Sequence, residues 1–237
     1  MFRIITVAAA CGAVTLGSLV GTVPAFASPA DGAPTPTAHS SLSVIQQAGA
    51  TATAHRIRDL TTGIGKVNST STLSAADKST VLGNLNADLS GMRGLQTKIA
   101  ADTAPSTAWS DYRSIFTGYR VYAVGLRQSH IAAAADGLTG TAIPKLQSAA
   151  AKISALFASN PAKATPELQA QLADMQAKTA DAVSKTSGLA AAALAVTPAA
   201  YNADHAVLTD DRAAARAALA DSKAAAQDGR SILAALK

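Results

Sequence analysis

Apolar side chains recur every three or four residues along most of the chain, which is the period of an amphipathic α-helix. Residues 42–103 hold two such segments separated by a short polar string. Ser74, followed three residues later by Asp77, is typical of a helix N-cap. One stripe on the second segment carries Val81, Leu85, Leu89, Met92, Leu95 and Ile99. Because the connection is short, the pattern predicts an antiparallel helical hairpin over residues 42–103.

The clearest repeat in the chain follows Thr165 and Pro166, a pair typical of a helix start. Apolar and small residues then alternate in steps of four and three, like the seam of a coiled coil. This predicts one unbroken helix over 166–196. The seam over 168–196 has two possible partners, another helix of the same chain or a second copy in an oligomer.

Two further helices are predicted over residues 130–158 and 203–236. The first of them contains Gly137, Gly140 and Pro144, residues that weaken or break helices, so interruptions are expected there. The spatial order of the helices is left open by the sequence.

Alanine supplies about a quarter of the residues, whereas aromatic residues supply 4%. Alanine has the highest helix propensity and a small side chain, so alanine-rich helices can approach each other closely. The pattern therefore predicts an all-α protein, a single helical domain over residues 41–237. We expect elongated antiparallel hairpins that pack as a coiled-coil-like bundle.

Residues 1–27 have the pattern of a signal peptide. Arg3 precedes a long apolar run, and Ala25 and Ala27 occupy the two small positions that a signal peptidase recognises. This predicts cleavage near Ala27–Ser28 and a secreted or extracytoplasmic protein with no transmembrane segment after cleavage. The alternative is an uncleaved membrane anchor, because the apolar run is nearly long enough to span a bilayer.

The only cysteine, Cys11, lies within this signal peptide. Small residues before it raise the alternative of a lipoprotein, but the apolar run continues well past it. The mature chain therefore has no disulfide and no thiolate metal site. Residues 28–40, rich in proline and threonine, predict a flexible leader before the fold.

The charge is mildly basic. Removing Arg3 with the signal peptide leaves 19 basic and 15 acidic residues, a net charge of +4. These charges are intermixed along the sequence, unlike the concentrated basic face of a nucleic-acid-binding protein. No nucleic-acid partner is expected.

An aromatic and arginine-rich segment over residues 107–128 is the main candidate interaction surface. On a helix its aromatic side chains would form one stripe and its arginines, seven residues apart, another. One interpretation is a recognition surface for a small ligand or an anionic polymer. The other interpretation is that the aromatic side chains pack between hairpins and the arginines are solvated on the outside. Residues 120–127 fit either a helix or an extended segment. The candidate residues are Trp109, Tyr112, Arg113, Phe116, Tyr119, Arg120, Tyr122 and Arg127.

No catalytic, cofactor-binding or metal-binding motif is present. The four histidines lie far apart without a zinc-binding spacing, although His130 near Asp136 or His205 near Asp204 has the chemistry of a metal ligand. Glu167 is the only glutamate, so a pair of catalytic carboxylates would need aspartates. We therefore expect no cofactor, no metal and no enzymatic activity.

The stretch from Tyr112 to Val124, YRSIFTGYRVYAV, resembles a segment of uncharacterised secreted alanine-rich helical proteins from high-GC Gram-positive (actinobacterial) bacteria. Thr197 and Pro198, followed by the residues YNAD from Tyr201, are similar to a second segment of those proteins. The resemblance implies a helical fold and an extracytoplasmic location, and it implies no activity.

These observations favour an exported, non-enzymatic helical protein that acts as a structural or interaction module at the cell envelope, with a protein or an envelope polymer as partner. The alternative is a carrier or binder of a small ligand or anionic polymer through the Trp109–Arg127 segment. An envelope hydrolase ranks third, and it would require a concave pocket with at least two inward-facing carboxylates.

Overall fold

The computed structural model describes residues 35–236, and every regular element in that range is a helix. The elements in chain order are α1 (Leu42–Ser69), α2 (Ala75–Ala101), α3 (Pro105–Thr117), α4 (Gly125–Gly137), the π-helix η1 (Leu138–Ala142), α5 (Ile143–Ser159), the 3₁₀-helix η2 (Pro161–Lys163), α6 (Pro166–Thr186), α7 (Leu189–Ala195), α8 (Pro198–Ala203) and α9 (Thr209–Ala235). The all-α prediction is confirmed. The predicted signal peptide and residues 28–34 of the predicted leader lie outside the described residues.

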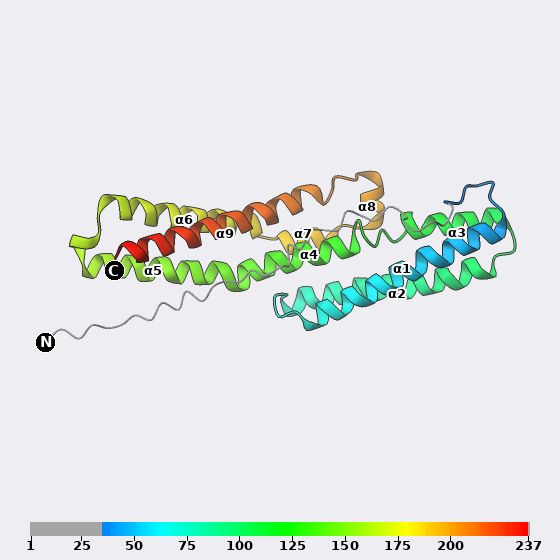
Figure 1. Ribbon diagram of the computed structural model, residues 1–237, viewed down its shortest axis with the longest axis horizontal. Helices are drawn as coiled ribbons and strands as arrows, with labels where there is room; N and C mark the ends of the chain where they lie inside the picture. The colour runs from blue at the N-terminus through cyan, green and yellow to red at the C-terminus, as the bar shows by residue number, and fades with distance from the viewer. Residues whose placement is uncertain (1–34, 237) are drawn as a thin grey trace.

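The first bundle consists of the α1–α2 hairpin and α3, which packs on both of its helices (Figure 1). The Ser74 hydroxyl accepts a hydrogen bond from the Asp77 backbone N–H at 3.1 Å, so the predicted N-cap of α2 is confirmed. All six apolar residues predicted to share a stripe on α2 are buried. They form the centre of this bundle because their spacing keeps them on the side that faces α1 and α3.

A continuous helix made of α4, η1 and α5 connects this bundle to the next. The interruption expected around Gly137, Gly140 and Pro144 is the π-helix η1, which interrupts the α-helical hydrogen bonding but does not end the helix. Within η1 the Ile143 N–H bonds to the Leu138 carbonyl, five residues back instead of four. This wider turn gives the Pro144 ring the room that a regular α-helix denies it, and the chain stays helical.

The second bundle consists of α5, α6 and α9, and its most extensive contact is between α6 and α9. The Thr165 hydroxyl accepts from the Leu168 N–H at 3.4 Å and Pro166 begins the helix, as predicted. The seam residues of α6 are buried inside the chain: Leu172, Met175, Thr179, Ala182 and Thr186. The α6 seam is thus occupied by helices of the same molecule.

The helix predicted over 166–196 is divided in two. It ends at Thr186, and α7 begins at Leu189. Gly188 between them has a φ of 69°, a left-handed conformation that glycine adopts readily because it lacks a Cβ atom. The spacing of apolar residues continues across the break, which is why the sequence pattern did not reveal it. The break directs α7 onto α4.

The helix predicted over 203–236 begins later than expected. The short helix α8 comes first, with the Thr197 hydroxyl accepting from the Ala200 N–H at 3.1 Å. The chain then turns, and the Asp204 side chain accepts from the Ala206 N–H at 2.8 Å before α9 begins. This turn places α8 beside α3.

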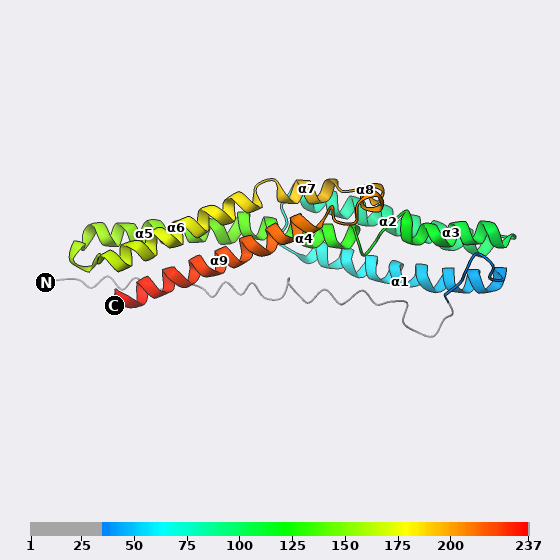
Figure 2. The same ribbon diagram turned by 90° about the horizontal axis from the view of Figure 1, so that it is seen from above.

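The molecule is a rod with one bundle at each end and with α4 and α7 where the two meet (Figures 1 and 2). One core cluster joins α1, α2, α3, α4 and α7 with the start of α9, and a second joins α5, α6 and α9. A smaller cluster lies beside η1. None of the described helices combines the length and the apolar character needed to cross a bilayer.

Candidate functional site

The aromatic residues of α3 pack against each other on its inner side. The rings of Trp109 and Tyr112 are stacked with centroids 5.6 Å apart, and Phe116 meets Tyr112 edge-on at 5.2 Å. Tyr112 is buried, and Trp109 and Phe116 are half-buried against the core of the first bundle. These three side chains therefore hold α3 on the hairpin.

Arg56, which sequence analysis did not single out, lies among these aromatic side chains. Its guanidinium carbon is 4.5 Å from the Phe116 ring centroid and 5.1 Å from that of Tyr122, a distance at which the cation attracts both rings. Its Nη1 donates to the Ala52 carbonyl at 2.9 Å. Burial lowers the pKa of Arg56, and the nearby Tyr122, Tyr112 and Asp59 partly offset that shift.

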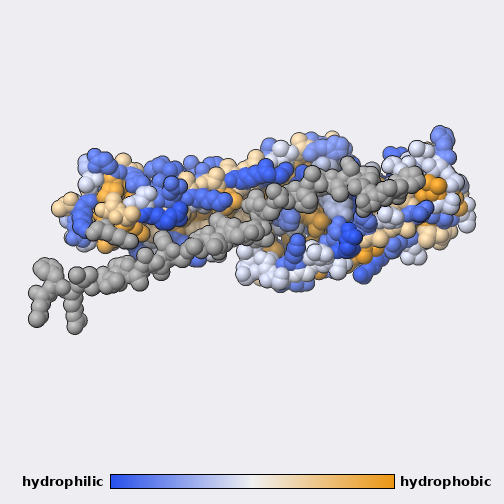
Figure 3. Space-filling model, viewed as in Figure 1, coloured by the Kyte–Doolittle hydropathy of each residue, from blue (hydrophilic) through white to orange (hydrophobic). Residues whose placement is uncertain are grey.

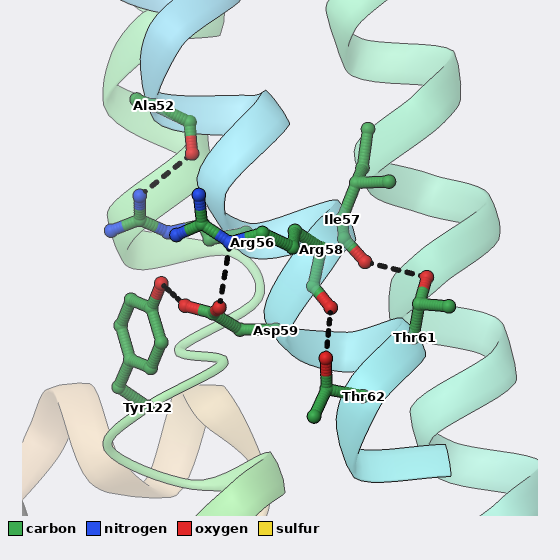
Figure 4. A network of polar contacts seen from close by, with 8 residues as sticks. All are labelled: Ala52, Arg56, Ile57, Arg58, Asp59, Thr61, Thr62 and Tyr122. Atoms are coloured by element: carbon green, nitrogen blue, oxygen red, sulfur yellow. Dashed lines mark hydrogen bonds and ion pairs between the residues drawn. The ribbon is translucent and has the colours of Figure 1, made fainter. Parts of the chain in front are cut away.

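The Tyr122 hydroxyl donates to Asp59 Oδ2 at 2.6 Å (Figure 4). The other oxygen of this carboxylate accepts from Arg58 Nε at 3.3 Å. Burial, and then the bond to Asp59, raise the pKa of Tyr122 to about 12. This network fastens the turn after α3 to the middle of α1.

The helix predicted to carry the aromatic stripe ends at Thr117, and a turn occupies the residues up to Val124. Tyr119 and Tyr122 therefore lie in the turn. Arg120 has a φ of 48°, a left-handed conformation that is strained for a residue with a long side chain. Of residues 120–127, which the sequence left as either helical or extended, the first five form a turn and the rest belong to α4, which begins at Gly125.

Asn202 on α8 holds this turn in place. Its side-chain nitrogen donates to the Thr117 carbonyl at 2.7 Å, and its oxygen accepts from Arg120 Nε at 2.6 Å. The Arg120 guanidinium also lies 5.3 Å from the Tyr201 ring. The two segments that carry the resemblance to secreted actinobacterial proteins thus meet here, and their contact explains the unusual backbone of Arg120.

The three candidate arginines do not share one helical face, because the turn separates them. Arg113 is exposed on α3, Arg120 contacts α8, and Arg127 is half-buried on α4. Arg127 lies close enough to α9 to affect Arg212, whose pKa is lowered by burial, then by Arg216 and then by Arg127.

An open groove of about 740 Å³ lies between α2 and α3, lined in part by Gly91, Lys98, Asp111 and Tyr119. Lys98 Nζ lies 2.9 Å from Asp111 Oδ1. The Oδ2 atoms of Asp111 and Asp102 are buried, and neither has a hydrogen-bond partner among residues 35–236. Burial raises the pKa of Asp102, and the neighbouring Asp111 raises it further. The charge of Lys98 acts in the opposite direction and lowers it.

A smaller pocket of about 270 Å³ is lined by Asp77 and Asp136, where the α1–α2 turn meets η1 and the α6–α7 break. Both carboxylates bind Ser74: Asp136 accepts from its backbone N–H at 2.7 Å, and Asp77 lies 2.9 Å from its hydroxyl. Burial, and then Asp77, raise the pKa of Asp136, although the bond to Ser74 lowers it. This is the feature nearest to a hydrolase pocket, but it is smaller than most ligand sites and its acids hold a turn.

The histidines lie apart from these acidic pairs. His205 packs edge-on against Tyr201 with ring centroids 5.0 Å apart. Within residues 35–236, no group of three or more His, Cys, Asp or Glu side chains is arranged to hold a metal ion.

Comparison with known proteins gives no relative: no family model, no curated protein and no solved structure matches the chain. The resemblance to secreted actinobacterial proteins therefore stays a prediction.

Proposed function

We propose that the chain is an exported, non-enzymatic structural or interaction module at the cell envelope. The observation that supports this most is the single helix from Gly125 to Ser159, which packs against the first bundle through α4 and forms part of the second through α5. At about 1.5 Å per residue this helix is about 50 Å long. A body built around such a shaft keeps its two ends at a fixed separation, a property suited to a spacer or scaffold.

The surface also fits a partner that is polar. Among the described residues, Val183 is the only large hydrophobic residue that is exposed, at 40%. Partners that dock through apolar grooves need a larger exposed apolar area. We therefore expect contacts through charged and polar side chains, such as those an envelope polymer or a hydrophilic protein offers.

The alternative, ligand binding through the Trp109–Arg127 segment, draws support from the half-buried Trp109 and the exposed Arg113. Trp109 is the only tryptophan, so its fluorescence reports on this segment directly. A change in its emission on titration with a small ligand or anionic polymer would favour this alternative. An unchanged spectrum would leave the structural role as the better proposal.

Cell fractionation tests the main proposal. An antibody against the purified protein is used to follow the native chain in the medium, envelope and cytoplasm, and mass spectrometry identifies its first residue. We expect a chain that begins at Ser28 and is retained by the envelope fraction. An intact chain that begins at Met1 and stays in the cytoplasm would contradict the proposal.

A further inference from the structure

Helix α9 separates its acidic and basic residues onto different sides. Two of its acids face α6, where Lys185 Nζ lies 2.6 Å from Asp221 and Lys178 Nζ lies 2.9 Å from Asp228. The positive charges of those lysines are therefore matched across the α6–α9 interface. The bases of α9 lie on its other side, away from this interface.

Four bases share that other side, and together they form what is called here the α9 ridge: Arg212, Arg216, Lys223 and Arg230. They follow each other at intervals of four, seven and seven residues, and seven residues are close to two full helical turns. Arg212 is half-buried and the other three are exposed. From first to last the ridge is about 27 Å long at the helical rise of about 1.5 Å per residue.

No ion pair within residues 35–236 involves a member of the α9 ridge. Asp210 and Asp211 stand immediately before Arg212 in sequence, yet in the part of the chain that the structure describes neither forms an ion pair with a base of the ridge. Burial raises the pKa of Asp211, and the charge of the neighbouring Asp210 raises it further. The ridge therefore keeps its full positive charge.

Three arginines approach each other at the N-terminal end of the ridge. Arg127 of α4 approaches it there, and α4 packs against α9. Repulsion from Arg216 and Arg127 adds to the effect of burial in lowering the pKa of Arg212. A bound anion would relieve this repulsion, and guanidinium groups bind phosphate oxygens with two parallel hydrogen bonds.

We propose that the α9 ridge binds a linear phosphate-bearing polymer of the cell envelope. This inference rests on the proposed function and names its partner. The bases lie in a single row, which fits one extended chain of phosphates. A row of hydrophilic surface follows α9 in Figure 3, and the one exposed large hydrophobic residue in the described range, Val183, belongs to α6. Helices that bind membrane surfaces carry apolar residues for insertion.

Long-chain inorganic polyphosphate is the probe for the test, with its binding to the purified protein followed by fluorescence anisotropy at several salt concentrations. The test variant is Arg216→Gln/Lys223→Gln/Arg230→Gln. Its control, Arg58→Gln/Lys66→Gln/Arg93→Gln, removes the same charge from exposed positions of the first bundle. Circular dichroism checks that both variants stay folded.

We expect the ridge variant to bind polyphosphate about tenfold or more weakly, and its logarithmic salt dependence to lose a slope of about two to three. The control should bind within about twofold of the unaltered protein. Equal weakening of both variants would mean that net charge alone drives binding, and this would overturn the inference. Binding only to anionic vesicles or to duplex DNA would overturn it as well.

The two proposals fail separately. Retention of the protein by the envelope without any binding of polyphosphate would refute the ridge inference and leave the envelope module intact. Binding of polyphosphate by a chain that stays in the cytoplasm would refute the envelope location, and with it an envelope polymer as the partner.

Discussion

Glycines on α2 occupy two different environments. A Cβ atom at Gly91 would lie 2.2 Å from Tyr119 Cε1, whereas one at Gly83 would have no neighbour within 4 Å. We expect Gly83→Ala to stabilise the protein by about 0.5–1 kcal/mol through helix propensity. Gly91→Ala should destabilise it by about 1–3 kcal/mol, because Tyr119 must leave its position. Urea unfolding followed by circular dichroism measures both, and equal effects would contradict the close approach of Tyr119.

Burial raises the pKa of the Asp88 carboxyl group from 3.8 to about 6. This carboxyl group lies close to Gly125, since a Cβ atom at Gly125 would be 3.0 Å from Asp88 Oδ2. The folded state therefore holds this proton more tightly than the unfolded state, and stability falls as the pH rises from about 4 to 6. With solvent screening, the loss should be about 1 kcal/mol.

Asp88→Asn should remove that loss. We expect the variant to be more stable than the unaltered protein by about 1 kcal/mol at pH 7 and equally stable at pH 4. Denaturation midpoints at the two pH values measure the difference. Asp181→Asn, a change at an exposed aspartate of α6, serves as control and should alter stability at pH 7 by less than about 0.5 kcal/mol. A uniform effect of Asp88→Asn at both pH values would argue against burial as the cause.

At single positions, the features that could be predicted from the sequence are those determined by the spacing of nearby residues. The α2 stripe and the Ser74 cap were found because neighbours in sequence determine them. Arg56 was missed. It lies three positions after Thr53 and four before Leu60, which are both buried, so helical periodicity places it on the buried side of α1. The bonds from Asn202 to the turn after α3 join residues more than 80 positions apart, so no local pattern indicated them.

The break between α6 and α7 depends on one residue. Gly188 has a φ of 69° and no neighbour within 4 Å of its Cβ position, so only the backbone conformation opposes a side chain there. We expect Gly188→Ala to destabilise the protein by about 1–2 kcal/mol. Gly65→Ala, at an open helical position of α1, should stabilise it slightly. Thermal unfolding compares the two, and a stabilising Gly188→Ala would mean that α6 and α7 prefer to be one helix.

Helix starts that carry a capping hydroxyl were predicted more accurately than helix interruptions. Thr165 and Ser74 act through their own hydroxyl groups, so their effect is local. Pro144 and Gly188 act through the surrounding packing, since the first is accommodated by a π-turn and the second lets α7 reach α4. The same residue types therefore break the chain at one place and leave it helical at another, and only tertiary contacts decide between them.

The arrangement of the helices in space was beyond prediction from periodicity. Alanine-rich faces such as those of α6 and α9 accept many partners of similar shape, so the seam alone did not distinguish a partner in the same chain from one in a second copy. The choice follows from the break at Gly188 and the turn before α9, which together return the chain along α6. In the described residues the result is a rod whose two bundles share one helix and meet at α4 and α7.

This shared helix predicts that the rod unfolds as one unit. Trp109, the only tryptophan, lies in the first bundle, whereas Ile153 is buried in the core of the second. Ile153→Ala should destabilise the protein by about 2–4 kcal/mol through the cavity it leaves. If α4, η1 and α5 couple the bundles, the unfolding midpoint reported by Trp109 fluorescence falls as far as that reported by circular dichroism.

Leu85→Ala, in the first bundle, should shift both midpoints together as well. An unchanged Trp109 midpoint in Ile153→Ala, with a biphasic circular dichroism curve, would show that each bundle folds alone, and the shared helix would then be a linker between two independent domains.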